Sequence, residues 1–72
     1  MTDNIVGIDG GKIRRLRMDK DISAKELGEI AGMTEGMVRH IENGIRTTNA
    51  ISFKKIADAL EVAVDDLYIT EA

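Results

Sequence analysis

Cysteine is absent from this 72-residue sequence, so neither a disulfide framework nor a thiolate nucleophile or metal ligand is available. The one histidine, His40, has no cysteine partner, and we expect neither a metal site nor a cofactor. A nucleophile–base pair and a cofactor loop are missing too, which argues against an enzyme. Stability must therefore come from packing of the chain.

Long hydrophobic runs are also absent. No stretch of about 18 apolar residues exists to span a membrane, and the N-terminus lacks the basic-then-apolar layout of a secretory signal. We therefore expect a cytoplasmic protein, nucleoid-associated if it is prokaryotic. No membrane partner and no small-molecule ligand is evident.

The net charge of −3 is distributed unevenly along the chain. Residues 11–46 hold eight basic and six acidic side chains, whereas the rest hold two basic and seven acidic ones. This difference permits a basic face, although an acidic chain argues against strong non-specific binding to DNA. With 43% apolar and 32% charged residues, the composition predicts one small folded domain.

Helix start and stop signals are frequent and alternating β patterns nearly absent, which predicts an all-α fold. We expect five short helices around one core, at about residues 11–19, 23–31, 34–43, 52–60 and 65–68. The predicted core residues are Ile13, Leu16, Leu27, Ile30, Ala31, Met37, Val38, Ile41, Phe53, Ile56, Ala57, Leu60 and Leu67, with Met18 and Met33 as gap fillers.

The ends of the chain are assigned by the same signals. Residues 1–10 form an N-terminal tail, 11–69 the domain and 70–72 the C-terminal end. The only strand candidate runs from Ile5 to Ile8, and Gly7 weakens it. The apolar side chains of this tail are expected to pack, either on the domain or on a second subunit.

The second and third helices carry the clearest local signals. Ser23 can cap the second helix while Glu26 reaches back to complete a capping box, and Gly32 ends this helix. Thr34 can cap the third helix, which ends at Asn43-Gly44. The turn between the two helices is therefore only three or four residues long.

A capped helix, a glycine turn and a second capped helix ending in Ile41-Glu42-Asn43-Gly44 resemble the helix-turn-helix of the phage repressor and Cro proteins, also called the xenobiotic-response-element family. The resemblance covers roughly residues 11–68. It implies a λ-repressor-like domain that binds double-stranded DNA sequence-specifically as a transcriptional regulator, usually a repressor and commonly a homodimer. The third helix would then lie in the major groove.

The resemblance also implies roles for single residues. The positions expected to face base edges are Thr34, Glu35, Gly36, Arg39 and His40, where Arg39 would donate to guanine and Glu35 would accept from cytosine N4. The phosphate-contact candidates are Lys25, Asn43 and Arg46. The family uses the positions of Arg17 and Glu42 for a partly buried ion pair, so we leave both out of base readout.

Two departures from the family pattern keep an alternative open. Ala24 stands where the family commonly has glutamine, and Thr48 where its loop usually has proline. Together with Gly36 on the recognition surface and the acidic total charge, Ala24 favours a second hypothesis: a protein-interaction module on the same fold, with weak or no DNA binding. Val62, Val64, Tyr68 and Ile69 remain candidates either for a dimer surface or for the core.

Overall fold

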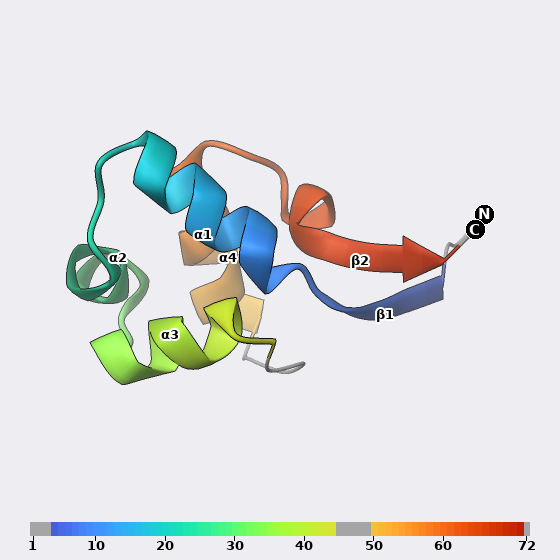
Figure 1. The fold of residues 1–72 in the computed structure, drawn as a ribbon, viewed down its shortest axis with the longest axis horizontal. Coiled ribbons are helices and arrows are strands. Elements are labelled where there is room, and N and C mark those ends of the chain that lie inside the picture. The colour runs from blue at the N-terminus through green and yellow to red at the C-terminus, as the bar shows by residue number, and fades with distance from the viewer. Residues whose placement is uncertain (1–3, 45–49, 72) are drawn as a thin grey trace.

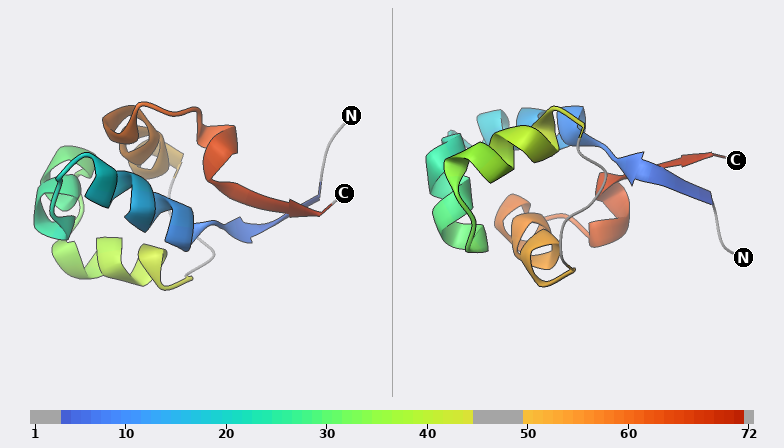
Figure 2. Two further views of the ribbon diagram at one scale, coloured as in Figure 1. Left: turned by 45° about the horizontal axis from the view of Figure 1, so that its top comes forward. Right: turned by 90° about the horizontal axis from the view of Figure 1, so that it is seen from below.

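The computed structural model describes residues 4–44 and 50–71. In this part of the chain the elements are β1 (Asn4–Ile8), α1 (Gly10–Asp19), α2 (Ala24–Ala31), α3 (Glu35–Glu42), α4 (Ala50–Leu60), the 3-10 helix η1 (Val64–Leu67) and β2 (Tyr68–Glu71). The helices cluster at one end of the molecule, and the two strands extend from it side by side (Figure 1). At the outer end of this sheet Asn4 of β1 pairs with Glu71 of β2, and both further views show the two strands projecting from the helices (Figure 2).

The all-α class of a λ-repressor-like domain is confirmed, with two corrections to the expected elements. The fifth segment is a 3-10 turn, not an α-helix. Residues 4–8, expected within a tail, form a strand that pairs antiparallel with β2, as Ile8 opposite Tyr68 illustrates. The register shifts between Ile5 and Gly7. A glycine inside a strand is typical of such a bulge, so Gly7 marks an irregular strand here.

The junction between β1 and α1 joins the sheet to the helices. The amide of Asp9 donates to the carbonyl of Leu67 at 2.8 Å, and the Asp9 carboxylate caps α1 by accepting from the amide of Lys12 at 3.0 Å. Gly10, expected to separate a tail from the first helix, is the first residue of α1. A Cβ at this glycine would lie 2.3 Å from the carbonyl oxygen of Ile41, so a larger side chain has no room.

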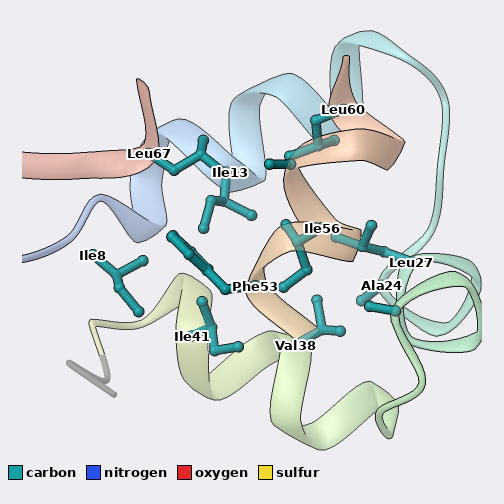
Figure 3. Packing of buried hydrophobic residues seen from close by; sticks show 12 residues of the cluster. Ile8, Ile13, Ala24, Leu27, Val38, Ile41, Phe53, Ile56, Leu60 and Leu67 are labelled. Carbon is teal, nitrogen blue, oxygen red and sulfur yellow. The ribbon is translucent and has the colours of Figure 1, made fainter. Parts of the chain in front are cut away.

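The core lies between the four α-helices and η1, and Figure 3 shows its side chains converging. Ile13, Leu27, Ile56 and Leu67 are fully buried. Each such side chain contributes roughly 1.5–3 kcal/mol by leaving water. The remaining buried apolar residues are Ile8, Ala24, Ala31, Val38, Ile41, Phe53, Ala57 and Leu60, while Leu16, Ile22, Met33, Ala59, Val62, Val64 and Tyr68 pack against them half-buried.

Some of the predicted core residues are exposed. The exposed fraction is 52% for Ile30, 56% for Met18 and 39% for Met37. Met33, in contrast, packs against the core. The buried side of α2 consists of Ala24, Leu27, Gly28 and Ala31, and that of α3 consists of Val38 and Ile41. Ile30 and Met37 lie outside these buried sides. The fourth helix, expected from residue 52, begins earlier at Ala50, so Ser52 lies inside α4.

The candidate dimer residues near the C-terminus divide between core and surface. Val62, Val64 and Tyr68 pack on the core, and the ring of Tyr68 lies 5.1 Å from that of Phe53, centroid to centroid. Ile69 is 45% exposed. Of the four, Ile69 therefore has the most apolar surface left for a partner.

Candidate nucleic-acid interface

The start of α2 has the predicted capping box. The hydroxyl of Ser23 accepts from the amide of Glu26 at 3.0 Å, and the carboxylate of Glu26 accepts from the amide of Ser23 at 2.9 Å. The hydrogen bond that the Glu26 carboxylate accepts from the Ser23 amide, and after it one from the Ser23 side chain, lower the pKa of Glu26, because they favour its charged form. The backbone at the start of α2 is thus held by its own side chains.

The turn between α2 and α3 is set by two glycines. Gly32 has φ 73°, a left-handed conformation that favours glycine, and it ends α2 as predicted. Gly28 is buried in α2, where a Cβ would lie 2.6 Å from the carbonyl oxygen of Met33. The chain therefore passes directly over α2 on its way to Thr34, whose hydroxyl caps α3 by accepting from the amide of Met37 at 3.1 Å.

An ion pair ties α1 to the end of α3. Arg17 Nε lies 2.6 Å from Glu42 Oε2, and Arg17 Nη2 lies 3.2 Å from Glu42 Oε1. A third donor, Arg17 Nη1, bonds the carbonyl of Ile22 at 2.9 Å. The two side chains are only 11% and 5% exposed. This is the arrangement expected for these two residues, and it keeps both away from a ligand on the outer side of α3.

The outer side of α3 brings four of the expected base-contact residues together at the surface. Glu35, Gly36, Arg39 and His40 are all exposed, whereas Val38 and Ile41 on the opposite side are buried. Arg39 Nε and Nη2 donate to Glu35 Oε2 at 3.1 and 2.8 Å. The fifth candidate, Thr34, is exposed at the start of the helix and uses its hydroxyl as the cap.

The phosphate-contact candidates lie at helix ends. Lys25 is exposed in the first turn of α2, and Asn43 is exposed as the residue after α3. Arg46 lies outside the described residues. Lys25 therefore lies at the start of α2 and Asn43 at the end of α3. At these two positions, the side chains could contact the sugar-phosphate backbone of a nucleic acid bound along α3.

A surface hollow of about 140 Å³ adds a residue that the sequence analysis did not select. Arg14 lines this hollow from α1, opposite Arg39 and Asn43, with Glu42 beside them. The carboxylate oxygens of Glu42 are both bonded to Arg17, and the guanidinium group of Arg39 is bonded to Glu35. Among the described residues, Arg14 is therefore the charged side chain of this lining that has no ion-pair partner. A signal was present in the sequence: Arg14 precedes Arg17 by three residues, and so shares the side of α1 that faces α3.

Ala24 has a structural role in this fold. It is 2% exposed and belongs to the core. Its small side chain is therefore explained by packing, and it does not by itself indicate that DNA affinity is lost.

Three of the acidic residues near the C-terminus have partners within the fold. Asp58 bonds Lys54, Glu61 pairs with Lys20, and the Asp66 carboxylate accepts from the amide of Ala63. Within residues 4–44 and 50–71 no group of three His, Asp or Glu side chains is placed to hold a metal ion. None of the helices in these ranges is long and apolar enough to cross a membrane.

Comparison with known proteins agrees with this geometry. A family model described as helix-turn-helix matches residues 13–67. No curated protein sequence matches significantly.

Several solved structures are similar. SinR, the regulator of biofilm formation from Bacillus subtilis, solved in complex with DNA, is 30% identical over 81% of this chain and 94% of its own, with a TM-score of 0.68. The restriction-modification controller protein C.AhdI from Aeromonas hydrophila is 28% identical over 79% of this chain and 86% of its own, with a TM-score of 0.71.

The P22 c2 repressor, solved on a synthetic operator, shares the fold at 22% identity, with 83% of this chain and 91% of its own covered and a TM-score of 0.76. The family match begins within α1 and contains α2, α3 and α4, including the capped pair α2 and α3 with its glycine turn. This chain belongs to the helix-turn-helix family.

Proposed function

We propose that this protein is a transcriptional regulator that binds double-stranded DNA sequence-specifically by placing α3 in the major groove. One observation carries the proposal: α3 is held by a buried side and by the Arg17–Glu42 pair, while its outer side presents Glu35, Arg39 and His40 to solvent. A helix that is held in place by its buried side and exposed on its other side is suited to contact base edges. SinR and the P22 c2 repressor, which share the fold, are bound to DNA in their structures.

We propose that the surface formed by Thr34, Glu35, Gly36, Arg39 and His40 faces the bases, and that Lys25, Asn43 and Arg46 contact phosphates. To these the hollow beside α3 adds Arg14. The guanidinium group of Arg14 faces this opening and can donate to a phosphate oxygen, since arginine offers paired donors to such groups.

Repression by occupancy of the site is the proposed mode of action, with the protein in the cytoplasm beside the chromosome. We propose that it acts as a homodimer, because one module of this size buries little DNA surface. Two copies would read half-sites about 34–36 Å apart. The exposed Ile69 is the proposed centre of the contact between the copies.

The test is selection of bound sequences from a random duplex pool, followed by titration of the selected duplex by fluorescence anisotropy at several salt concentrations. Enrichment of a two-fold symmetric motif supports a dimeric regulator. Arg14→Ala should weaken binding evenly across sequences and reduce the salt slope by about 1. Arg15→Ala is the matched control, since Arg15 is an exposed arginine of α1 outside the lining of the hollow.

Absence of enrichment even at low salt contradicts the proposal. The acidic total charge would then favour the alternative of a protein-interaction module on the same fold. A salt slope that Arg14→Ala leaves unchanged would remove Arg14 from the phosphate contacts and leave the rest of the proposal standing.

A further inference from the structure

On the outer side of α3, Glu35 and Arg39 form a pair one helical turn apart. Arg39 Nε and Nη2 both donate to the same oxygen, Glu35 Oε2, at 3.1 and 2.8 Å. The side chains remain 60% exposed for Arg39 and 45% exposed for Glu35. The pair is therefore preformed on the very surface proposed to meet the bases.

A guanidinium group is planar and has two edges that each offer a pair of parallel donors. In Arg39 one edge consists of Nε and Nη2, and Glu35 occupies it. The other edge consists of Nη1 and the second hydrogen of Nη2, and in residues 4–44 and 50–71 no acceptor is bonded to it. A pair of donors on one edge matches the O6 and N7 acceptors of guanine.

Gly36 leaves the approach to this edge open. It precedes Arg39 by three residues and is therefore its neighbour on the helix surface. A Cβ at Gly36 would meet only the hydroxyl oxygen of Thr34, at 3.8 Å. Nothing at position 36 stands between the guanidinium and a base edge.

The pairing also removes an electrostatic difficulty. A lone carboxylate at position 35 would repel the phosphates of an approaching duplex. When Glu35 is bound to Arg39, the negative charge of the carboxylate is offset. The Arg39 side chain also loses less rotamer entropy on binding a base, because Glu35 already holds it in place.

Resting on the proposed DNA-binding function, we propose that Glu35 is a positioning residue: it holds one edge of Arg39 so that the other edge reads a guanine. The recognised sequence then contains a G·C pair at the position of Arg39. Glu35 does not itself read a separate cytosine, in contrast to the role expected for it from the sequence.

The test compares base preferences of wild type, Glu35→Gln, Arg39→Ala and the double variant, by selection and by competition with duplexes that differ at one position. Arg39→Ala should abolish the guanine preference at one position, a loss of about 5- to 150-fold in discrimination, the worth of one bidentate contact. Glu35→Gln should weaken the preference at that same position. In the Arg39→Ala background, Glu35→Gln should have no further effect on it.

Glu29→Gln is the matched control, because it removes the same charge from an exposed glutamate of α2 and should leave all preferences unchanged. Circular dichroism and thermal unfolding verify that every variant folds. If Glu35 had only a structural role, Glu35→Gln would change the unfolding temperature and would not change the base preference at one particular position. A preference altered at a different position by Glu35→Gln, or an effect that persists without Arg39, overturns the inference. A wild type that selects no sequence overturns the proposed function itself, and the inference with it.

Discussion

Arg17 and Glu42 are 25 residues apart in the sequence, and Arg17 Nε lies 2.6 Å from Glu42 Oε2 in the fold. Both side chains are nearly buried, so each is the principal compensation for the other's lost hydration. The pair fixes the end of α3 against α1, and hence the orientation of the proposed recognition surface.

Removal of one partner should therefore be costly. Glu42→Ala leaves the Arg17 guanidinium without its counter-charge, and we expect about 3 kcal/mol less free energy of unfolding in urea titrations. Asp58→Ala, which breaks the exposed pair with Lys54, should cost less than about 1 kcal/mol. Equal losses from the two substitutions would show that the Arg17–Glu42 pair is no more than a surface contact.

Gly28 should tolerate no side chain. A Cβ there would lie 2.6 Å from the carbonyl oxygen of Met33, a backbone atom that cannot move without shifting the turn. We expect Gly28→Ala to destabilise the fold by roughly 1–3 kcal/mol, measured by thermal unfolding, despite the better helix propensity of alanine. Gly11→Ala in α1 is the control, since its Cβ would meet only an Asp9 oxygen at 3.8 Å; a similar loss there would refute the steric explanation.

Gly36 should behave in the opposite way. The chain has room for a methyl group at this exposed position, so Gly36→Ala should stabilise α3 by roughly 1 kcal/mol. We expect DNA affinity to fall at the same time, because the added methyl group separates the backbone from the bases. Thermal unfolding and anisotropy titration measure the two quantities, and a variant that is more stable and binds unchanged would show that the DNA does not approach here.

Glu26 should make the stability of the protein dependent on pH in the acid range. Its pKa is lowered below the ordinary value of 4.5, first by the hydrogen bond from the Ser23 backbone amide and then by that from the Ser23 hydroxyl. A carboxyl with a depressed folded-state pKa stabilises the fold above about pH 4.5, and this contribution is lost as the pH falls through the lower folded-state value. Glu26→Gln should flatten this part of the stability profile, whereas Glu29→Gln should not; identical profiles for wild type and Glu26→Gln would contradict the capping role.

Ile8 should contribute to the core from outside the helices. It is 6% exposed, and Ile8→Ala should lower the free energy of unfolding by about 2–4 kcal/mol. Ile69→Ala, in the partner strand but 45% exposed, should cost much less in the isolated protein. If Ile8→Ala lowers the free energy of unfolding no more than Ile69→Ala does, β1 does not contribute to the stability of the folded domain.

Local signals sufficed for much of the helical layout. The Ser23–Glu26 box, the Gly32 stop and the Thr34 cap are hydrogen bonds and backbone conformations within four residues, so the amino-acid types alone predicted them. The stripe of Phe53, Ile56, Ala57 and Leu60 was predicted for the same reason, since spacings of three and four place residues on one side of a helix.

Other features depended on contacts between distant segments. The pairing of β1 with β2, the burial of Ala24 and the exposure of Ile30 and Met37 follow from which neighbour each residue meets. No local pattern specifies this, because it depends on which segments pack together: β1 forms opposite β2, and Ile30 and Met37 lie outside the buried sides of their helices.

At the proposed interface the same division holds. Residue spacing and capping signals alone predicted a helix-turn-helix whose outer side contains Glu35, Gly36, Arg39 and His40, because helical periodicity separates these from Val38 and Ile41. That Arg14 lines the same hollow as Arg39 and Asn43 could be learned from the folded chain alone, since it requires α1 to pack beside α3. The spacing of four residues allows Glu35 and Arg39 to pair, but it does not predict which edge of the guanidinium group Glu35 occupies. That depends on the side-chain conformations in the folded chain.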